Sequence, residues 1–114
     1  MENVVYNELR ARGFSVDVGV VSKRVLDDKG KKRVSNLEVD FVANLGSRRY
    51  YIQSAYALPD ADKRKQEKAS LVGIDDSFKK IVIVKDVVNV LRDDDGIVTM
   101  GLFDFLLDPH SLER

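Results

Sequence analysis

The chain has 114 residues, of which 44% are hydrophobic and 33% are charged, and its 19 basic residues balance 19 acidic ones. This is the composition of one ordinary soluble globular domain. Because the chain contains no cysteine, it can form neither a disulfide nor a thiolate metal site. A net charge of zero argues against a domain that binds nucleic acid over its whole surface.

Nothing in the sequence predicts contact with a membrane. No apolar stretch approaches the 18 residues of a spanning helix, and the start has no basic segment followed by an apolar one, as a signal peptide would. We therefore expect a cytoplasmic location. Met1 precedes a helix almost directly, so we expect residues 1–114 to be one domain that is part of a longer protein.

The charge is uneven along the chain. The segment Ser22–Asn36 holds six basic and two acidic side chains, a local excess of +4. It is either a solvated hairpin tip or a loop that contacts phosphate. On the second reading, the candidate nucleic-acid-binding residues are Lys29, Lys31, Lys32 and Arg33.

The first predicted element is an amphipathic helix over Glu2–Arg12. Val5 and Leu9 repeat at helical spacing, and Gly13 can end the helix in a left-handed conformation. Glu2 shares the helical face of these apolar residues. We therefore expect one carboxylate on the buried side of this helix.

Alternation of apolar and polar residues predicts strands over three segments, residues 14–21, 36–44 and 49–55. The short turn Leu45–Arg48 contains a glycine and predicts an antiparallel hairpin between the second and third strands. A turn at Asp28–Lys31 separates the first two strands. Val25 and Val34 could then pair as an extension of that hairpin.

The period changes in the second half of the chain. Pro59 and Asp60 favour the start of a mostly charged helix that ends at Gly73. Ile81–Val84 is a continuous β-branched run, which predicts a strand covered on both faces. A short strand at residues 97–100 and a short helix at residues 102–107 complete the order. The sequence thus predicts an α+β domain with a mixed sheet flanked by helices, in the order αβββαβ, with a small β-α appendage.

Three polar residues interrupt apolar patterns: Glu2 on the first helix, Asp40 in the second strand and Gln53 in the third. Carboxylates are rarely buried unless they are paired or bind metal. Two acids and a third oxygen donor at one end of a sheet could hold Mg²⁺. The alternatives remain open: Asp40 could face solvent, Gln53 could satisfy backbone groups, and Glu2 could simply favour the helix N-terminus.

These residues, in the order αβββαβ, resemble the PD-(D/E)XK, or restriction-endonuclease-like, nuclease fold. Active members carry an acid on the second strand and an acid, any residue, then lysine on the third, and the first helix often adds a glutamate. The resemblance aligns Glu2 with the helix acid and Asp40 with the acid of the second strand. It places Gln53 on the third-strand acid and Ala55 on the lysine.

A closer resemblance covers nearly the whole chain, to the C-terminal domain of a prokaryotic AAA+ ATPase family whose function is unknown. It is carried by seven segments: Glu2–Leu9, Arg12–Gly13, Glu38–Val42, Tyr51–Gln53, Ala55–Tyr56, Asp95–Ile97 and Asp104–Leu107. In that family an upstream module binds the nucleotide. This chain has no Gly-x-x-x-x-Gly-Lys-Ser/Thr loop, so we do not expect it to bind ATP in that way.

The departures at Gln53 and Ala55 imply a degenerate site, since alanine cannot activate water and a neutral amide binds metal less well than a carboxylate. We therefore expect a non-catalytic accessory domain without a cofactor, which contacts DNA or another protein. One alternative is a nuclease using Mg²⁺ or Mn²⁺, with a lysine supplied by Lys63 or Lys65. Another is a homodimerisation module that uses apolar residues of Leu102–Leu107.

Overall fold

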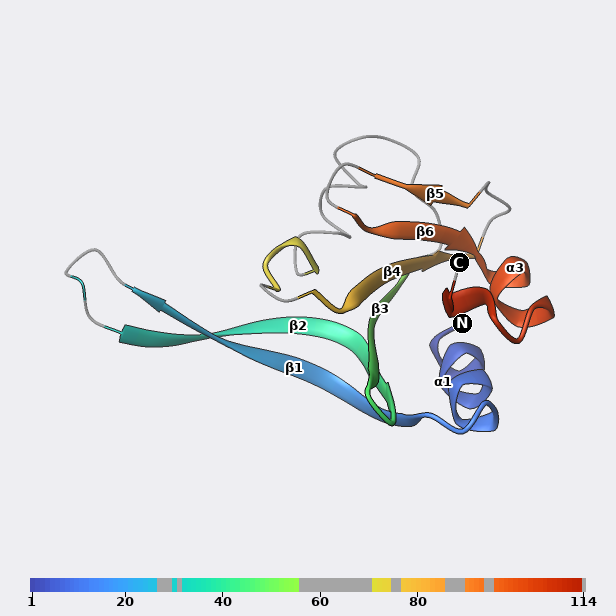
Figure 1. Ribbon diagram of the computed structural model, residues 1–114, viewed down its shortest axis with the longest axis horizontal. Coiled ribbons are helices and arrows are strands. Elements are labelled where there is room, and N and C mark those ends of the chain that lie inside the picture. The colour runs from blue at the N-terminus through green and yellow to red at the C-terminus, as the bar shows by residue number, and fades with distance from the viewer. Residues whose placement is uncertain are drawn as a thin grey trace.

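A computed structural model describes residues 1–26, 30, 32–55, 71–74, 77–85, 90–93 and 96–113; the side chains of residues 20–26, 32–38 and 91 are not described. The elements are α1 (Glu2–Ala11), β1 (Ser15–Leu26), β2 (Lys32–Leu45), β3 (Arg48–Ala55), β4 (Lys79–Val84), β5 (Leu91–Arg92), β6 (Val98–Gly101), α3 (Leu102–Leu107) and the 3₁₀ helix η1 (Ser111–Glu113). One sheet carries α1, α3 and η1 on the same side (Figure 1).

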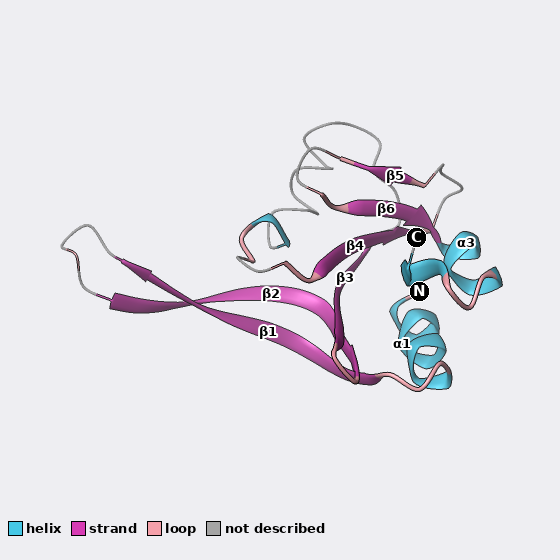
Figure 2. Ribbon diagram, in the orientation of Figure 1, coloured by secondary structure: helices cyan, strands magenta, loops and turns pink. Residues whose placement is uncertain are grey.

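The sheet is mixed, with strand order β1-β2-β3-β4-β6-β5 (Figure 2). β1, β2 and β3 pair in antiparallel fashion, whereas β3–β4 and β4–β6 are parallel and β5 is antiparallel to β6. A parallel pair needs a crossover connection, which separates the N-terminal meander from the C-terminal strands. The predicted α+β domain with a mixed sheet and flanking helices is confirmed at this level.

α1 packs one apolar stripe against the sheet. Val5 and Leu9 are fully buried, and Gly13, with φ of 92°, ends the helix in the left-handed region that glycine adopts without strain. The prediction that Glu2 lies on the buried side was wrong, because its side chain is exposed. Glu2 is the first residue of α1, and at this end of the helix its side chain reaches solvent.

β4 is buried on both faces, as its β-branched run predicts. Ile81 and Ile83 belong to the apolar cluster beneath α1 and α3, while Val82 and Val84 belong to a second cluster on the other face. All four side chains are at most 1% exposed. Each contributes about 1.5–3 kcal/mol by burial. β4 therefore contributes to the apolar cores on both faces of the sheet.

β1 and β2 extend further than the alternating pattern predicts, into the basic segment from both of its ends. Their pairing continues without interruption from Gly19↔Val39 to Leu26↔Lys32. The predicted pairing of Val25 with Val34 was wrong by one position, since Val25 faces Arg33 and Val34 faces Arg24. The two strands form a long ribbon that projects away from the helices (Figure 1).

The predicted charged helix lies almost entirely outside the described residues. Leu71 and Val72 are helical and Gly73 is in a turn, which agrees with the predicted end. β5 and η1 were not predicted. Over the part of the chain that the structure describes, no helix is long and apolar enough to cross a membrane.

Candidate functional site

A cavity of about 600 Å³ lies between the first turns of α1 and the sheet, at the base of the β1–β2 ribbon. Its walls come from α1, β1, β2 and β3. Glu2, Asp40 and Gln53 all line it, so the structure brings together the three polar residues that the sequence singled out. Tyr6 and Phe41, whose ring centroids are 6.2 Å apart, form part of its apolar wall.

The cavity lies where β2 separates from β3. Regular pairing of these strands ends at Phe41↔Ile52. At the next position, side chains replace the backbone ladder, and the Oε1 atom of Gln53 accepts a hydrogen bond from the Asp40 N–H at 2.9 Å. Gln53 thus satisfies a backbone donor that the separating strand would otherwise leave unpaired.

The Asp40 carboxylate makes the reciprocal contact. Its Oδ2 atom accepts a hydrogen bond from the Ser54 N–H at 2.8 Å and another from the Ser54 hydroxyl at 2.9 Å. Hydrogen bonds to an ionised acceptor are stronger than neutral ones. Asp40 and Gln53 together therefore hold the two strands at the point of separation.

A bulge in β1 forms the opposite wall. The β1–β2 register shifts between Asp17 and Gly19, and Val18 at the shift is 74% exposed. Gly19 has φ of 141°, a conformation that residues with a side chain rarely adopt. A bulge bends its strand and increases the local twist, which turns the ribbon away from the sheet at the mouth of the cavity.

Glu2 lies between this cavity and a smaller one of about 280 Å³, which is also lined by Ser54 and Ala55. Its carboxylate is in the first turn of α1, where the helix dipole favours negative charge. Ala55 is 6% exposed and belongs to the second apolar cluster, together with Tyr51. A methyl group offers no proton donor at the position that the resemblance assigns to lysine.

At the cavity, the hydrogen bonds of Asp40 and Gln53 compete with coordination of a Mg²⁺ or Mn²⁺ ion. The cation needs several free oxygen ligands, usually including carboxylates. Here Asp40 Oδ2 and Gln53 Oε1 already accept hydrogen bonds from the backbone, and the third-strand position supplies a neutral amide. Among the described residues, no group of three or more His, Cys, Asp or Glu side chains is placed to hold a metal.

Several other candidate site residues lie in segments for which the structure describes only the backbone or nothing. Lys29 and Lys31 lie outside the described residues, as do Lys63 and Lys65, so a lysine supplied from the next helix stays a prediction. Lys32 and Arg33 lie in β2, where the backbone is described and the side chains are not.

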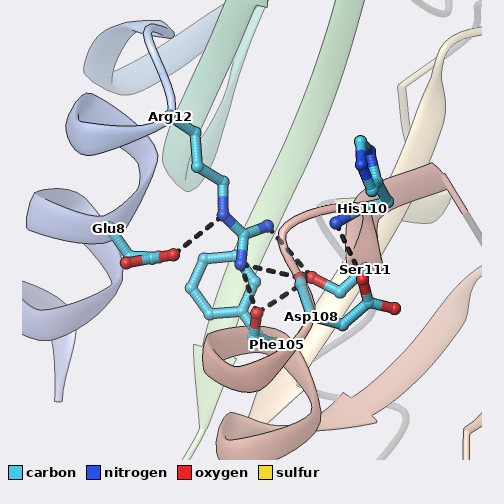
Figure 3. A network of polar contacts seen from close by, with 6 residues as sticks. All are labelled: Glu8, Arg12, Phe105, Asp108, His110 and Ser111. Atoms are coloured by element: carbon cyan, nitrogen blue, oxygen red, sulfur yellow. Dashed lines mark hydrogen bonds and ion pairs between the residues drawn. The ribbon is translucent and has the colours of Figure 1, made fainter.

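The sequence assigned Arg12 no structural role, but the structure gives it one. Its side chain is 8% exposed, and its Nε atom donates to Glu8 at 2.9 Å (Figure 3). The guanidinium also donates to the Phe105 and Asp108 carbonyls and, at 3.0 Å, to the Ser111 hydroxyl. It therefore satisfies carbonyls at the end of α3 and joins α1 to the C-terminal segment. Only the i, i+4 spacing to Glu8 was visible in the sequence.

η1 is attached to the sheet by two more cations. Lys79 Nζ donates to the Leu112 carbonyl at 2.6 Å, and Arg48 pairs with Glu113 at 2.6 Å. Burial, followed by the charge of Arg92, lowers the pKa of Lys79 below its usual value of 10.5, while Glu113 opposes the shift. These contacts hold the C-terminal segment in place and form no reactive group.

The short helix α3 exposes apolar side chains, as the dimerisation alternative requires. Phe105 is fully buried beneath it, whereas Phe103 is 60% and Leu107 81% exposed. Phe103 and Leu107 are four residues apart and therefore lie on the same side of the helix.

Comparison with known proteins gives one informative match. No protein-family model matches the chain. It is 35% identical over 107 residues to an uncharacterized protein of Haemophilus influenzae, an alignment that covers 94% of this chain and 22% of the relative. The chain thus spans about a fifth of the length of the curated relative that it matches.

Proposed function

We propose that this chain is a non-catalytic accessory domain with a degenerate nuclease site, carried by a larger AAA+-type ATPase. The order of α1, three antiparallel strands and a parallel β4 supports a restriction-endonuclease-like core. Glu2, Asp40 and Gln53 lie at the cavity where such a fold would place its active site. In this proposal the domain has the fold of a nuclease and lacks nuclease activity.

The observation that carries this proposal is the hydrogen bonding of Asp40 and Gln53. In a working metal site these side chains would coordinate the ion, whereas here Gln53 Oε1 and Asp40 Oδ2 accept hydrogen bonds from the backbone of the neighbouring strand. Ala55, buried at the position of the lysine, provides nothing to orient or deprotonate water. A cavity of this kind can maintain the shape of the fold without performing phosphodiester hydrolysis.

A larger parent protein is consistent with the length of the Haemophilus influenzae relative, of which the chain spans 22%. The rest of such a protein has room for an upstream ATPase module. In this arrangement, the domain would serve the ATPase in the cytoplasm by contacting DNA or by associating with protein.

Self-association is a second candidate role, favoured by the exposed Phe103 and Leu107 on α3. Burial of such side chains in a dimer would contribute about 1.5–3 kcal/mol each. Sedimentation over a range of concentrations would detect it as a rising mass that Leu107→Ser lowers. A constant monomer mass would remove this role.

A cleavage assay tests the proposed loss of catalysis. Supercoiled plasmid is incubated with the wild-type chain or Asp40→Ala, in Mg²⁺ and in Mn²⁺. We expect no nicking by the wild type beyond that of the variant. Metal-dependent nicking by the wild type that Asp40→Ala abolishes would refute the proposal and favour the nuclease with a relocated lysine.

A further inference from the structure

The β1–β2 ribbon is a two-stranded arm over most of its length. The strands pair from Gly19↔Val39 to Leu26↔Lys32, whereas β2 and β3 pair only as far as Phe41↔Ile52. The eight paired positions extend over about 24 Å. In this span, no third strand pairs with either side of the described ribbon, which leaves the molecule on the side away from α1 and α3 (Figure 2).

Positive charge is concentrated on this arm. Residues 22–26 and 32–36 include four cations, Lys23, Arg24, Lys32 and Arg33, and no acid. The register places these four residues on four successive paired positions. They therefore fall within about 10 Å along the ribbon. A chain with zero net charge thus carries four basic residues close together along the ribbon.

The acidic residues of the cavity lie at the other end of the ribbon. Glu2 and Asp40 line the cavity at its base, next to Val39, the last paired position of the arm. A polyanion would be attracted to the outer part of the arm and repelled from the cavity. The arrangement separates a binding element from the degenerate site.

The dimensions of the arm match one particular anion. The major groove of B-DNA is about 12 Å wide and admits a two-stranded β-ribbon. Each DNA strand carries a phosphate about every 3.4 Å, so four cations within about 10 Å can meet several phosphates that border one groove. A ribbon of only two strands is also marginally stable by itself in water, so contact with a partner would stabilise it.

We propose that the β1–β2 ribbon binds in the major groove of duplex DNA through Lys23, Arg24, Lys32 and Arg33. This inference rests on the accessory role proposed above and specifies its partner. Phosphate contacts supply the affinity, so binding is strongly dependent on salt and only weakly dependent on sequence.

The test is fluorescence anisotropy with a labelled duplex, over a series of KCl concentrations. Log affinity falls as log salt rises, and each cation that contacts a phosphate adds about 0.9 to the steepness of this fall. Replacing all four cations with glutamine therefore makes the slope shallower by about 3.6. Between about 50 and about 200 mM salt, the wild type therefore loses about 150-fold more affinity than the quadruple variant. Each double variant, Lys23→Gln with Arg24→Gln or Lys32→Gln with Arg33→Gln, removes about half of that slope.

Two controls keep the result specific. Arg10→Gln with Lys85→Gln removes two cations that lie on exposed parts of the body, and it leaves the slope unchanged. The exchange Lys32→Arg with Arg33→Lys retains the charge and retains binding. Thermal unfolding followed by circular dichroism shows whether each variant is folded.

The inference is overturned by equal slopes for the wild type and the quadruple variant, by an equal loss of slope in the body control, or by displacement with netropsin, which occupies the minor groove. Failure to bind any duplex at low salt also overturns it. The proposed loss of catalysis is tested separately on the same duplex, because cleavage in Mn²⁺ would refute that proposal whether or not the ribbon binds.

Discussion

Substitution of Asp40 distinguishes a structural role of this residue from a role as metal ligand. The two roles predict changes of opposite sign in the free energy of unfolding. Asp40→Ala removes the acceptor that serves the Ser54 N–H and hydroxyl. A partly buried backbone donor left without a partner costs about 1–3 kcal/mol, and the hydroxyl can rotate toward another acceptor. We therefore expect Asp40→Ala to lower the free energy of unfolding by about 2 kcal/mol.

Asp40→Asn tests how much of this effect comes from charge. The amide keeps an oxygen in the same place but loses the ionised acceptor, and charge-assisted hydrogen bonds are about twice as strong as neutral ones. We expect a loss of about 1 kcal/mol. If Asp40 were instead a free metal ligand close to Glu2, its neutralisation would relieve repulsion and stabilise the metal-free protein, as often happens at active sites.

The assay is urea unfolding followed by far-UV circular dichroism in EDTA at neutral pH. Asp17 provides the matched control, since it is an exposed carboxylate in β1 whose side chain forms no hydrogen bond with the described residues. Asp17→Ala and Asp17→Asn report the effect of strand propensity and should stay within about 0.5 kcal/mol of the wild type. Equal or greater stability of both Asp40 variants, after this correction, would refute the structural role.

Two further predictions concern the C-terminal segment. Arg12→Ala should lower the free energy of unfolding by about 3 kcal/mol, because partly buried carbonyls at the end of α3 lose their donor. Arg10→Ala, at an exposed position, should change it by less than about 0.5 kcal/mol, and similar losses for both variants in urea unfolding would contradict this. Burial and then Arg92 lower the pKa of Lys79, so the unfolded chain binds more protons than the folded one. Stability should therefore rise with pH in the window below 10.5, and Lys79→Gln should abolish this part of the rise in thermal melts at several pH values.

Much of the fold was predictable because local patterns agree with the packing. The helical stripe of Val5 and Leu9 and the β-branched run of β4 are both buried as their periods predict. β5 is only two residues long, and its pairing with β6 defines it, so no local pattern marks it. The ribbon was underestimated because polar and basic residues interrupt its alternation, while pairing with the opposite strand maintains it.

The sequence predicted which residues line the candidate site, but it did not predict their hydrogen bonds. Glu2, Asp40 and Gln53 were identified as interruptions of apolar patterns, and they line one cavity. Sequence periodicity does not show where β2 leaves β3, and that separation decides which groups the side chains of Asp40 and Gln53 satisfy. The bonding of Arg12 could not be predicted because most of its partners are more than 90 residues away in the sequence, and two of them are backbone carbonyls.

Calorimetric titration with Mn²⁺ tests most directly whether the cavity has lost its metal chemistry. The wild type, Asp40→Asn and Asp17→Asn are titrated in parallel, and we expect no stoichiometric binding by any of them. This result follows if Asp40 and Gln53 serve the backbone of the neighbouring strand. One-site binding by the wild type and Asp17→Asn that disappears in Asp40→Asn would contradict it, and would identify the cavity as a working metal centre.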